Sequence, residues 1–371
     1  MSRKLRIAYF AHSLRSDWNN GNAHFLRGLI REMGLRGHDV VAFEPRMGWS
    51  LKNLLEEPRG EAAVEQFTET YPDLRIRSYD PEQILHRDLW LNNLKDIDFA
   101  IMHEWNPPEL ANALLEARNT LKFRLLFHDT HHRASSSPEQ IRLYGVERFD
   151  GVVAFGEILR RIYREQFGIS RVWTLHEAAD AKVFHPMKVE AKEQDVIWIG
   201  NWGDEERAEE IHEFLLCSAE KMPQKRFTIH GVRYPDDALS ALSRSGVRYG
   251  GYLPNLDAPQ AYAHSCVTVH IPRRQYAQKM TGIPTIRVFE ALACGIPLIS
   301  APWQDTEKLF REGDFLFAEN GNAMSCAIRR LLEKPEEAAA QARRGREAVL
   351  ARHTCAHRAA QLEEICEEVL R

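Results

Sequence analysis

The residues best suited to chemistry stand at the ends of expected strands. Two segments are richest, "MHEWNPPE" and "FHDTHHRASSS", and each sets a histidine beside a carboxylate. Such pairs transfer protons in general acid–base catalysis. Asp129, with His128 beside it, is the first candidate proton acceptor, and His103 and Glu104 come second. An aspartate at a strand end also often caps the next turn, so a structural role for Asp129 stays open.

The same "HDTHH" run contains side chains that bind Zn²⁺ or Fe²⁺. No second cluster of carboxylates and histidines pairs with it along the chain. We therefore expect no metal site.

A different pattern surrounds Glu290, in "RVFEALACGIPLIS". Residues 286–294 are expected to form a helix, and Gly295 suits the position after its end. Arg287 and Glu290 lie three apart and share a face, so a solvated ion pair is one interpretation. The other uses the loop "TGIPT" (281–285). Its position at a helix start favours a diphosphate, and a glutamate one turn later can accept hydrogen bonds from ribose hydroxyls.

Glycines and cations follow other strands of the same half. "IGNWGD" puts Gly200 and Asn201 directly after a strand, where glycine lets a ligand approach the backbone. Arg233 follows "IHG", and Arg273 and Lys279 follow "VTVHIP". Arginine suits two-point contacts to phosphate, although each of these cations can equally be an ordinary surface charge.

The elements that position these residues alternate between strand-like and helix-like patterns. This rhythm implies a parallel sheet covered by helices. It stops at the polar, proline-bearing segment 183–194 and restarts with "DVIWIGN" and the helix "EERAEEIHEFLLCSAEKM". We expect an α/β protein of two doubly wound, Rossmann-like domains, with residues 1–182 in the first, 183–194 as linker and 195–371, including the terminal helices, in the second. Ligands of such folds bind beyond the carboxyl ends of the strands, and a cleft between the domains is the expected site.

The bulk composition narrows the class of protein. A chain of 371 residues with a net charge of −4 is long enough for two domains and gives no reason to expect nucleic acid as a partner. No apolar run approaches the ~20 residues of a transmembrane helix. The six cysteines show no CxxC spacing, which favours reduced thiols and a cytoplasmic location.

Several segments together resemble a known family. "RVFEALACGIPLISAPW", followed by "FREGDFLFAENGNAMSCAIRRLL", resembles the donor-binding half of GT-B-type glycosyltransferases, closest to the family 4-like and spore-maturation-type members. "NGNAHFLRGLIREMGLRGHDVVAFEP" is similar to the family's glycine loop, first helix and second strand. "DGVVAFGEILRRIY" and "EAADAKVFHP" look like the segment that leads into the linker. The resemblance covers nearly the whole chain and implies the GT-B architecture.

The resemblance also implies an activity, the transfer of a sugar (a hexose) from a nucleotide-diphosphate donor, with UDP as the expected nucleotide, to an acceptor hydroxyl. It implies neither a catalytic metal nor a further cofactor. The expected donor-binding residues are Glu290, Arg287, Thr285, Gly282, Arg273, Lys279, Gly200, Asn201 and Arg233. The expected catalytic residues are Asp129, His128 and His103, of which Asp129 would deprotonate the acceptor. Gly21, Asn22 and Glu104 would lie in loops beside the acceptor or the donor.

One departure leaves the reaction's stereochemistry open. Retaining family 4 enzymes usually carry two glutamates with seven residues between them, and the position of the first is Gly282 here. Two alternatives therefore stay in view, a non-catalytic GT-B-like subunit and a nucleotide-sugar 2-epimerase. A nicotinamide dehydrogenase is set aside because no G-x-G-x-x-G follows an expected strand. The acceptor could be a glycan, a lipid, a protein or a small metabolite.

Overall fold

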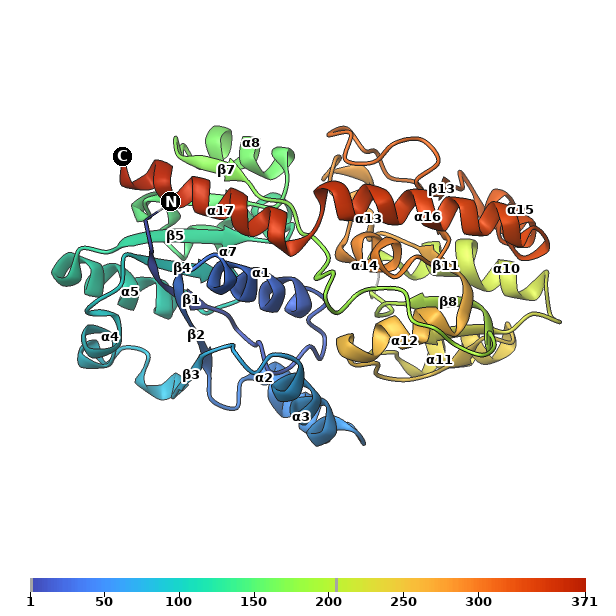
Figure 1. Ribbon diagram of the computed structural model, residues 1–371, viewed down its shortest axis with the longest axis horizontal. Helices are drawn as coiled ribbons and strands as arrows, with labels where there is room; N and C mark the ends of the chain where they lie inside the picture. Colours follow the sequence, from blue (N-terminus) through green and yellow to red (C-terminus); the bar gives the residue numbers. More distant parts are fainter. Residues whose placement is uncertain (1–2, 204–205) are drawn as a thin grey trace. The chain divides into compact units, whose positions relative to one another are not determined.

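The computed structural model describes residues 3–203 and 206–371. Its contacts divide the chain into two compact units, the first made of Met1–Glu177 with Cys355–Arg371 and the second of Ala178–Thr354. Each unit holds one parallel sheet with helices packed against it (Figure 1). The predicted pair of Rossmann-like domains is confirmed.

The first unit is built on a sheet of seven parallel strands in the order β3-β2-β1-β4-β5-β6-β7. The strands are β1 (Arg6–Phe10), β2 (Asp39–Pro45), β3 (Ile76–Tyr79), β4 (Phe99–His103), β5 (Arg124–Asp129), β6 (Gly151–Ala154) and β7 (Val172–Thr174). The helices are α1 (Ala23–Leu35), α2 (Trp49–Glu56), α3 (Gly60–Thr70), α4 (Arg87–Leu94), α5 (Pro108–Leu121), α6 (Arg133–Ser136), α7 (Pro138–Arg142), α8 (Glu157–Gln166) and α17 (Cys355–Leu370). The strand order reverses between β1 and β4, and ligands of doubly wound sheets bind at such a switch point.

The second unit repeats the plan with six parallel strands in the order β10-β9-β8-β11-β12-β13. The strands are β8 (Gln194–Ile199), β9 (Phe227–His230), β10 (Arg248–Tyr249), β11 (Ser265–His270), β12 (Leu298–Ser300) and β13 (Leu316–Phe317). The helices are α9 (Ala208–Ile211), α10 (Cys217–Glu220), α11 (Asp236–Arg244), α12 (Ala258–Ala263), α13 (Arg274–Gln278), α14 (Ile286–Cys294), α15 (Gly321–Glu333) and α16 (Pro335–Arg352), with a π-helical turn at His212–Leu216. The switch point here lies between β8 and β11. The predicted first residue of the helix after β8, Glu205, lies outside the described residues.

Most predicted elements are present, and the helix that carries Glu290 has the predicted bounds. It ends at Gly295, whose φ of 68° is the left-handed conformation expected there. Strands β3 and β13 were not predicted. Both are short and stand at or next to a sheet edge, so neither has the long buried apolar run that the other strands show.

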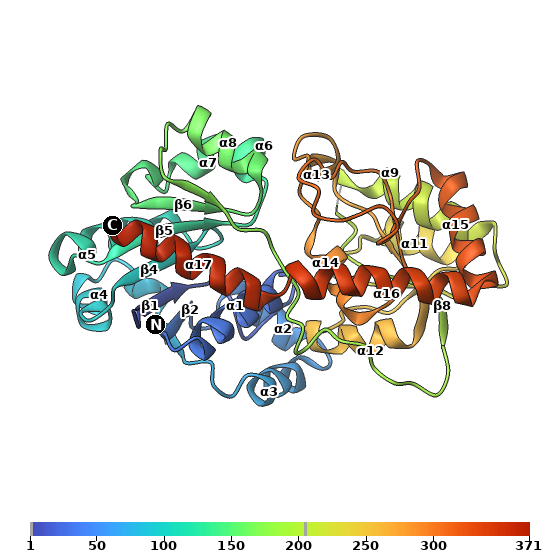
Figure 2. The same cartoon turned by 45° about the horizontal axis from the view of Figure 1, so that its top comes forward.

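Helix α14 is held in place by α16, which runs alongside it (Figure 2). A Cβ atom on Gly345 of α16 would come within 2.6 Å of Leu292 Cδ2 and 2.5 Å of the Asp314 carbonyl oxygen. Only glycine allows this close approach. The packing fixes the helix that presents Glu290 to the carboxyl edge of the sheet.

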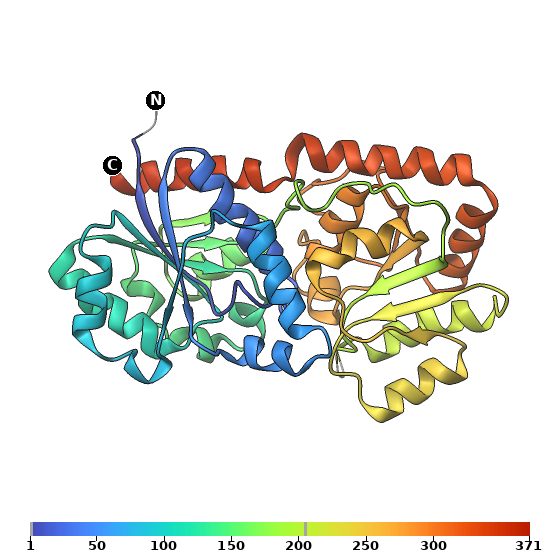
Figure 3. The same cartoon turned by 60° about the horizontal axis from the view of Figure 1, so that its bottom comes forward.

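The last helix differs from its predicted place. Residues 355–371 were assigned to the second domain, but α17 packs on α1 in the first unit (Figures 1 and 3). Leu362 and Cys366 are buried there. Glu363 pairs with Arg36 and lies 3.3 Å from His38 Nε2. The segment 183–194 also lies inside the second unit, which begins at Ala178. An amphipathic pattern predicts that a helix is buried, but not which surface it covers.

No helix within the described ranges combines the length and the apolar character needed to cross a membrane.

Replacing Leu362 tests whether α17 supports the first unit. Leu362→Ala removes a side chain that is 2% exposed, so the free energy of unfolding should fall by ~2–5 kcal/mol. Glu364→Ala, at an exposed position of the same helix, is the control and should change it by less than about 0.5 kcal/mol. Urea unfolding followed by circular dichroism measures both. Equal effects would contradict this packing role.

Candidate active site

The predicted polar residues of the first unit meet at the carboxyl ends of β4 and β5. His103 Nε2 lies 2.9 Å from Thr130 Oγ1, and the Thr130 hydroxyl donates to Glu104 Oε1 at 3.2 Å. Asn22, in the loop before α1, donates to the same Thr130 oxygen at 3.0 Å. Gly21 lies in the turn just before it. Thr130, which sequence reasoning missed, therefore joins the glycine loop to the predicted catalytic pair.

The buried pair His103 and Glu104 is not a simple ion pair. Burial, and then the charge of Asp129, raise the pKa of Glu104 well above its usual range. Burial, and then neighbouring histidines, lower the pKa of His103. Both shifts favour uncharged forms. His103 Nδ1 lies 3.1 Å from Glu104 Oε2.

Asp129 is fully buried, and its two oxygens already have partners. The Tyr163 hydroxyl donates to Oδ2 at 2.6 Å and the His131 amide to Oδ1 at 2.9 Å. Burial raises the pKa of Asp129 to about 6, although the Tyr163 and His131 hydrogen bonds lower it in part. The bond to His131 is the turn-capping role that the sequence left open.

His128 faces away from Asp129. Its Nδ1 lies 2.6 Å from the Tyr9 hydroxyl, and burial lowers its pKa to about 3. His132 Nδ1 instead lies 2.9 Å from Ser136 Oγ. Within the described part of the chain, no three His, Cys, Asp or Glu side chains converge as metal ligands would.

Two residues beside this buried network, His12 and Trp105, have exposed surface. The Trp105 side chain is 42% exposed, with the Arg133 guanidinium 4.3 Å from its ring and the His131 ring at 4.8 Å. His12 follows β1, is partly exposed, and stacks on His103 with 6.5 Å between ring centroids. Burial, and then Arg133, lower the pKa of His12 to about 4, so it is uncharged at neutral pH. Its place after a strand was the only sequence signal.

In the second unit, Glu290 is fully buried on α14 and pairs with Arg287 at 2.5 Å. The shared face predicted from their spacing is confirmed, but the pair is not a solvated one. Burial, and then the nearby charge of Glu290, raise the pKa of Tyr262 in α12. The Arg287 side chain is 24% exposed and that of Glu290 is not exposed, so the pair joins a partly accessible cation to a buried carboxylate.

An unpredicted cation, Arg207, lies at the centre of this edge. It donates to the Ile271 carbonyl oxygen at 3.2 Å and to that of Asn201, and its guanidinium lies 5.0 Å from the Trp198 ring. Burial, and then the charges of Arg273 and Arg287, lower the pKa of Arg207 to about 9. The sequence signal for this residue was the arginine at the end of "NWGDEER", which sequence reasoning missed.

The other predicted cations are not equivalent. Arg273 lies in the Arg207 neighbourhood and pairs with Glu206 at 2.8 Å. Lys279 and Arg233 are exposed, and neither forms an ion pair within the described ranges. Asn201 Oδ1 accepts from the Val232 amide at 2.9 Å, which joins the loops after β8 and β9.

Gly200 belongs to this close packing as well, because a Cβ atom there would lie 2.7 Å from the Trp198 ring.

Gly282 has a φ of 94°, a conformation that favours glycine. Its amide donates to the Gln304 carbonyl oxygen at 2.7 Å. A Cβ atom at Gly282 would lie 2.7 Å from Thr306 Oγ1 and 2.9 Å from Glu307 Oε1. The position that aligns with the missing glutamate therefore has no room for any side chain unless Thr306 and Glu307 move.

The comparisons with known proteins agree with this architecture. Residues 207–364 match a family model described as glycosyl transferase-like. A glycosyltransferase from Rickettsia africae has a TM-score of 0.68 and 12% identity, covering 100% of this chain and 99% of that one. Sucrose-phosphate synthase from Thermosynechococcus elongatus has a TM-score of 0.69 and 15% identity, covering 99% of each. HepE from Anabaena, in complex with UDP-glucose, has a TM-score of 0.72 and 13% identity, covering 98% and 100%.

No curated protein matches the sequence.

The chain has the GT-B glycosyltransferase fold. The predicted resemblance to GT-B-type glycosyltransferases is confirmed, and the glycosyl transferase-like segment includes Arg207, Thr285 and Glu290. Membership of the family 4-like or spore-maturation-type group stays a prediction.

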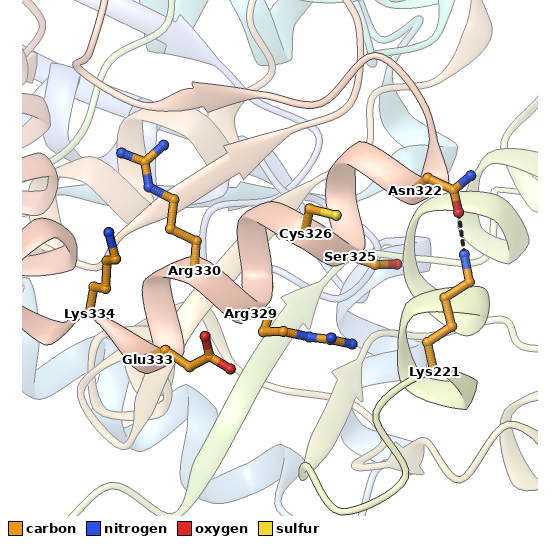
Figure 4. Close-up of a pocket in the computed structure, with 8 residues that line it drawn as sticks. All are labelled: Lys221, Asn322, Ser325, Cys326, Arg329, Arg330, Glu333 and Lys334. Atoms are coloured by element: carbon orange, nitrogen blue, oxygen red, sulfur yellow. Dashed lines mark hydrogen bonds between the residues drawn. The ribbon is translucent and has the colours of Figure 1, made fainter.

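The GT-B chain also has hollows away from the carboxyl edges of its sheets. One of about 400 Å³ lies between α10 and α15 (Figure 4). Lys221 donates to Asn322 at 2.6 Å across it, and two further cations of its lining, Arg330 and Lys334, pair with Glu337. None of the predicted site residues lines it.

The buried Asp129 gives the stability of this GT-B chain a characteristic pH dependence. Its pKa is about 6 in the folded chain and near 3.8 when unfolded, so between these values the folded state binds more protons. This contribution is therefore fully present below pH 4 and is lost as the pH rises to 6. The free energy of unfolding of the wild type, minus that of Asp129→Asn, should fall over this range and then level off.

Urea titrations at pH 4 to 7.5 measure this difference. Tyr163→Phe removes a hydrogen bond that lowers the pKa of Asp129, so the fall should move to higher pH. A difference that does not vary with pH would contradict the buried environment of Asp129.

Proposed function

We propose that the protein is a glycosyltransferase that moves a sugar from a nucleotide-diphosphate donor to an acceptor hydroxyl. The observation that carries the proposal is the gathering of Arg207, Arg273 and Arg287 beside the buried Glu290, inside the glycosyl transferase-like segment. Among the described residues, Arg273 pairs with Glu206 and Arg287 pairs with Glu290, and we propose that this arginine cluster binds an anion.

The second unit would hold the donor. The diphosphate would bind the arginines and the N-terminal amides of α14, where the helix dipole favours negative charge. Glu290 would accept hydrogen bonds from ribose hydroxyls. The similarity to HepE, whose structure holds UDP-glucose, supports UDP and a hexose as the first donor to test.

The chemistry is a substitution at the anomeric carbon. The bond from this carbon to the acceptor oxygen forms, the bond to the diphosphate oxygen breaks, and the acceptor loses its proton. The leaving diphosphate gains negative charge, which the arginines and helix amides would stabilise electrostatically without a metal ion.

The first unit would bind the acceptor, with the exposed ring of Trp105 as a stacking surface. Asp129, the base expected from the sequence, has no exposed atom and would act as a positioning residue. We assign proton acceptance to His12, because it is partly exposed, uncharged and adjacent to Trp105 at 6.3 Å between ring centroids. A base must reach the proton that it removes.

A cytoplasmic location is part of the proposal. All six cysteines carry thiols rather than disulfides in the described structure, and this chemistry suits a reducing compartment.

Donor binding gives the first test of the function. UDP, GDP, TDP and CDP, each with and without glucose, are titrated by calorimetry into wild type, Glu290→Gln and Arg207→Met. One nucleotide should bind, and Arg207→Met should weaken it at least ~10-fold through loss of charge-assisted hydrogen bonds. Arg233→Met, which changes an exposed cation, is the matched control and should stay within about twofold.

No binding of any nucleotide to the wild type would overturn the proposed donor, and equal losses for Arg207→Met and Arg233→Met would overturn the role of the arginine cluster. EDTA should leave the affinity unchanged.

The assignment of His12 is tested by turnover. Release of UDP from UDP-glucose with water as acceptor is followed in wild type, His12→Asn and Asp129→Asn. His12→Asn should lower kcat by ~100-fold, the usual size of a general-base effect, with donor affinity unchanged. Asp129→Asn should lower kcat less than His12→Asn does, because Asp129 is proposed to position other residues and not to contact the acceptor. The opposite order would return the role of base to Asp129.

A further inference from the structure

A short hydrogen-bonded relay joins three strand and helix ends in the second unit. His270, the last residue of β11, places Nδ1 2.8 Å from Ser300 Oγ of β12 and Nε2 2.9 Å from Thr285 Oγ1, at the start of α14. Ser300 lies 2.8 Å from the Ala301 carbonyl oxygen. His270 and Ser300 are buried, whereas Thr285 is partly exposed.

The position of each proton in the relay can be assigned by starting from Ser300, at the buried end of the relay. A carbonyl cannot donate, so the single hydroxyl proton of Ser300 goes to Ala301. Ser300 Oγ must then accept from His270, which places the imidazole proton on Nδ1. Burial, and then the charge of Arg207, lower the pKa of His270 to about 3, so the ring carries only this proton. Nε2 is left as an acceptor, and Thr285 must donate to it.

The hydroxyl proton of Thr285 is therefore used in the hydrogen bond to His270 Nε2. A threonine before a helix normally caps the first-turn amides, but this side chain makes no capping bond in the described structure. It does not compete for the amides that would hold a diphosphate. Its proton points to His270, so only lone pairs remain for a ligand.

We propose that Thr285 acts as a polarity filter in the donor site, accepting a hydrogen bond from a hydroxyl or N–H group of the nucleotide sugar, with His270 as the positioning residue that holds its proton. This inference rests on the proposed function.

The preference of Thr285 for a hydrogen-bond donor would fix the position of the nucleotide sugar along the site. A phosphate oxygen against Thr285 Oγ1 would oppose lone pair to lone pair, whereas the Arg207 and Arg287 guanidinium groups nearby carry only donors. The diphosphate is therefore directed to the arginines, and the hydroxyl-bearing part of the ligand to Thr285. A nucleotide sugar shifted along the site would lose the contact of its diphosphate with the arginines and the contact of its hydroxyl groups with Thr285.

The test compares two probes. UDP-glucose carries hydroxyl and N–H donors, and sulfate is an oxyanion that carries no proton. Thr285→Val, which keeps the shape and removes the acceptor, should weaken UDP-glucose ~5- to 10-fold, the effect of one hydrogen bond. Sulfate, measured by competition with UDP-glucose, should bind within about twofold of wild type. Thr285→Ser restores the hydroxyl and should recover most of the UDP-glucose affinity.

A second measurement needs no substitution. ¹⁵N NMR of the His270 ring in the intact protein should show the proton on Nδ1, although free histidine prefers Nε2. A proton on Nε2 would overturn the relay. Equal weakening of sulfate and UDP-glucose by Thr285→Val would overturn the filter. Failure of wild type to bind any nucleotide would instead overturn the proposed function, while the NMR result would still decide the relay.

Discussion

The carboxyl edge of the second sheet depends on one electrostatic constraint, the crowding of guanidinium groups around Arg207. Backbone carbonyl groups of Asn201 and Ile271 hold this side chain, and burial with two neighbouring arginines lowers its pKa to about 9. Charge held in this way is costly unless an anion shares the site. The loop after β8, the end of β11 and the start of α14 each place a residue near this side chain, namely Asn201, Ile271 and Arg287.

The first sheet uses its carboxyl edge in the opposite way. Its buried groups are carboxylates and histidines, and burial shifts each toward its uncharged form. Arg133 is the cation that acts on several of them. Such a network suits the holding and movement of protons, whereas the arginine-rich edge suits an anion. The two units therefore offer complementary chemistry on the same topology.

Thr130 and Thr285 show how a single hydroxyl organises each edge. Thr130 connects Asn22, His103 and Glu104, so the glycine loop and the two strand ends share one oxygen. Thr285 receives its orientation from His270 and Ser300. In both places, the hydroxyl contacts a buried histidine, His103 or His270.

Much of this protein was determined by the sequence alone. The alternation of apolar strands and amphipathic helices predicted both Rossmann-like domains, because burial on two faces requires those periodicities. The helix bounds around Glu290, its shared face with Arg287 and the polar strand ends at His103 and Asp129 were also predicted correctly.

Only the tertiary structure decided which side chains are buried and which residues they contact. It showed that Asp129 has no exposed atom, that α17 packs in the first unit, and that Arg207 lies near Arg273 and Arg287. It also showed that the site of the absent glutamate, Gly282, is filled by Thr306 and Glu307. Local pattern fixes which face of an element is apolar. The neighbours of a side chain, and hence its pKa and reach, depend on residues far away in sequence that only packing brings together.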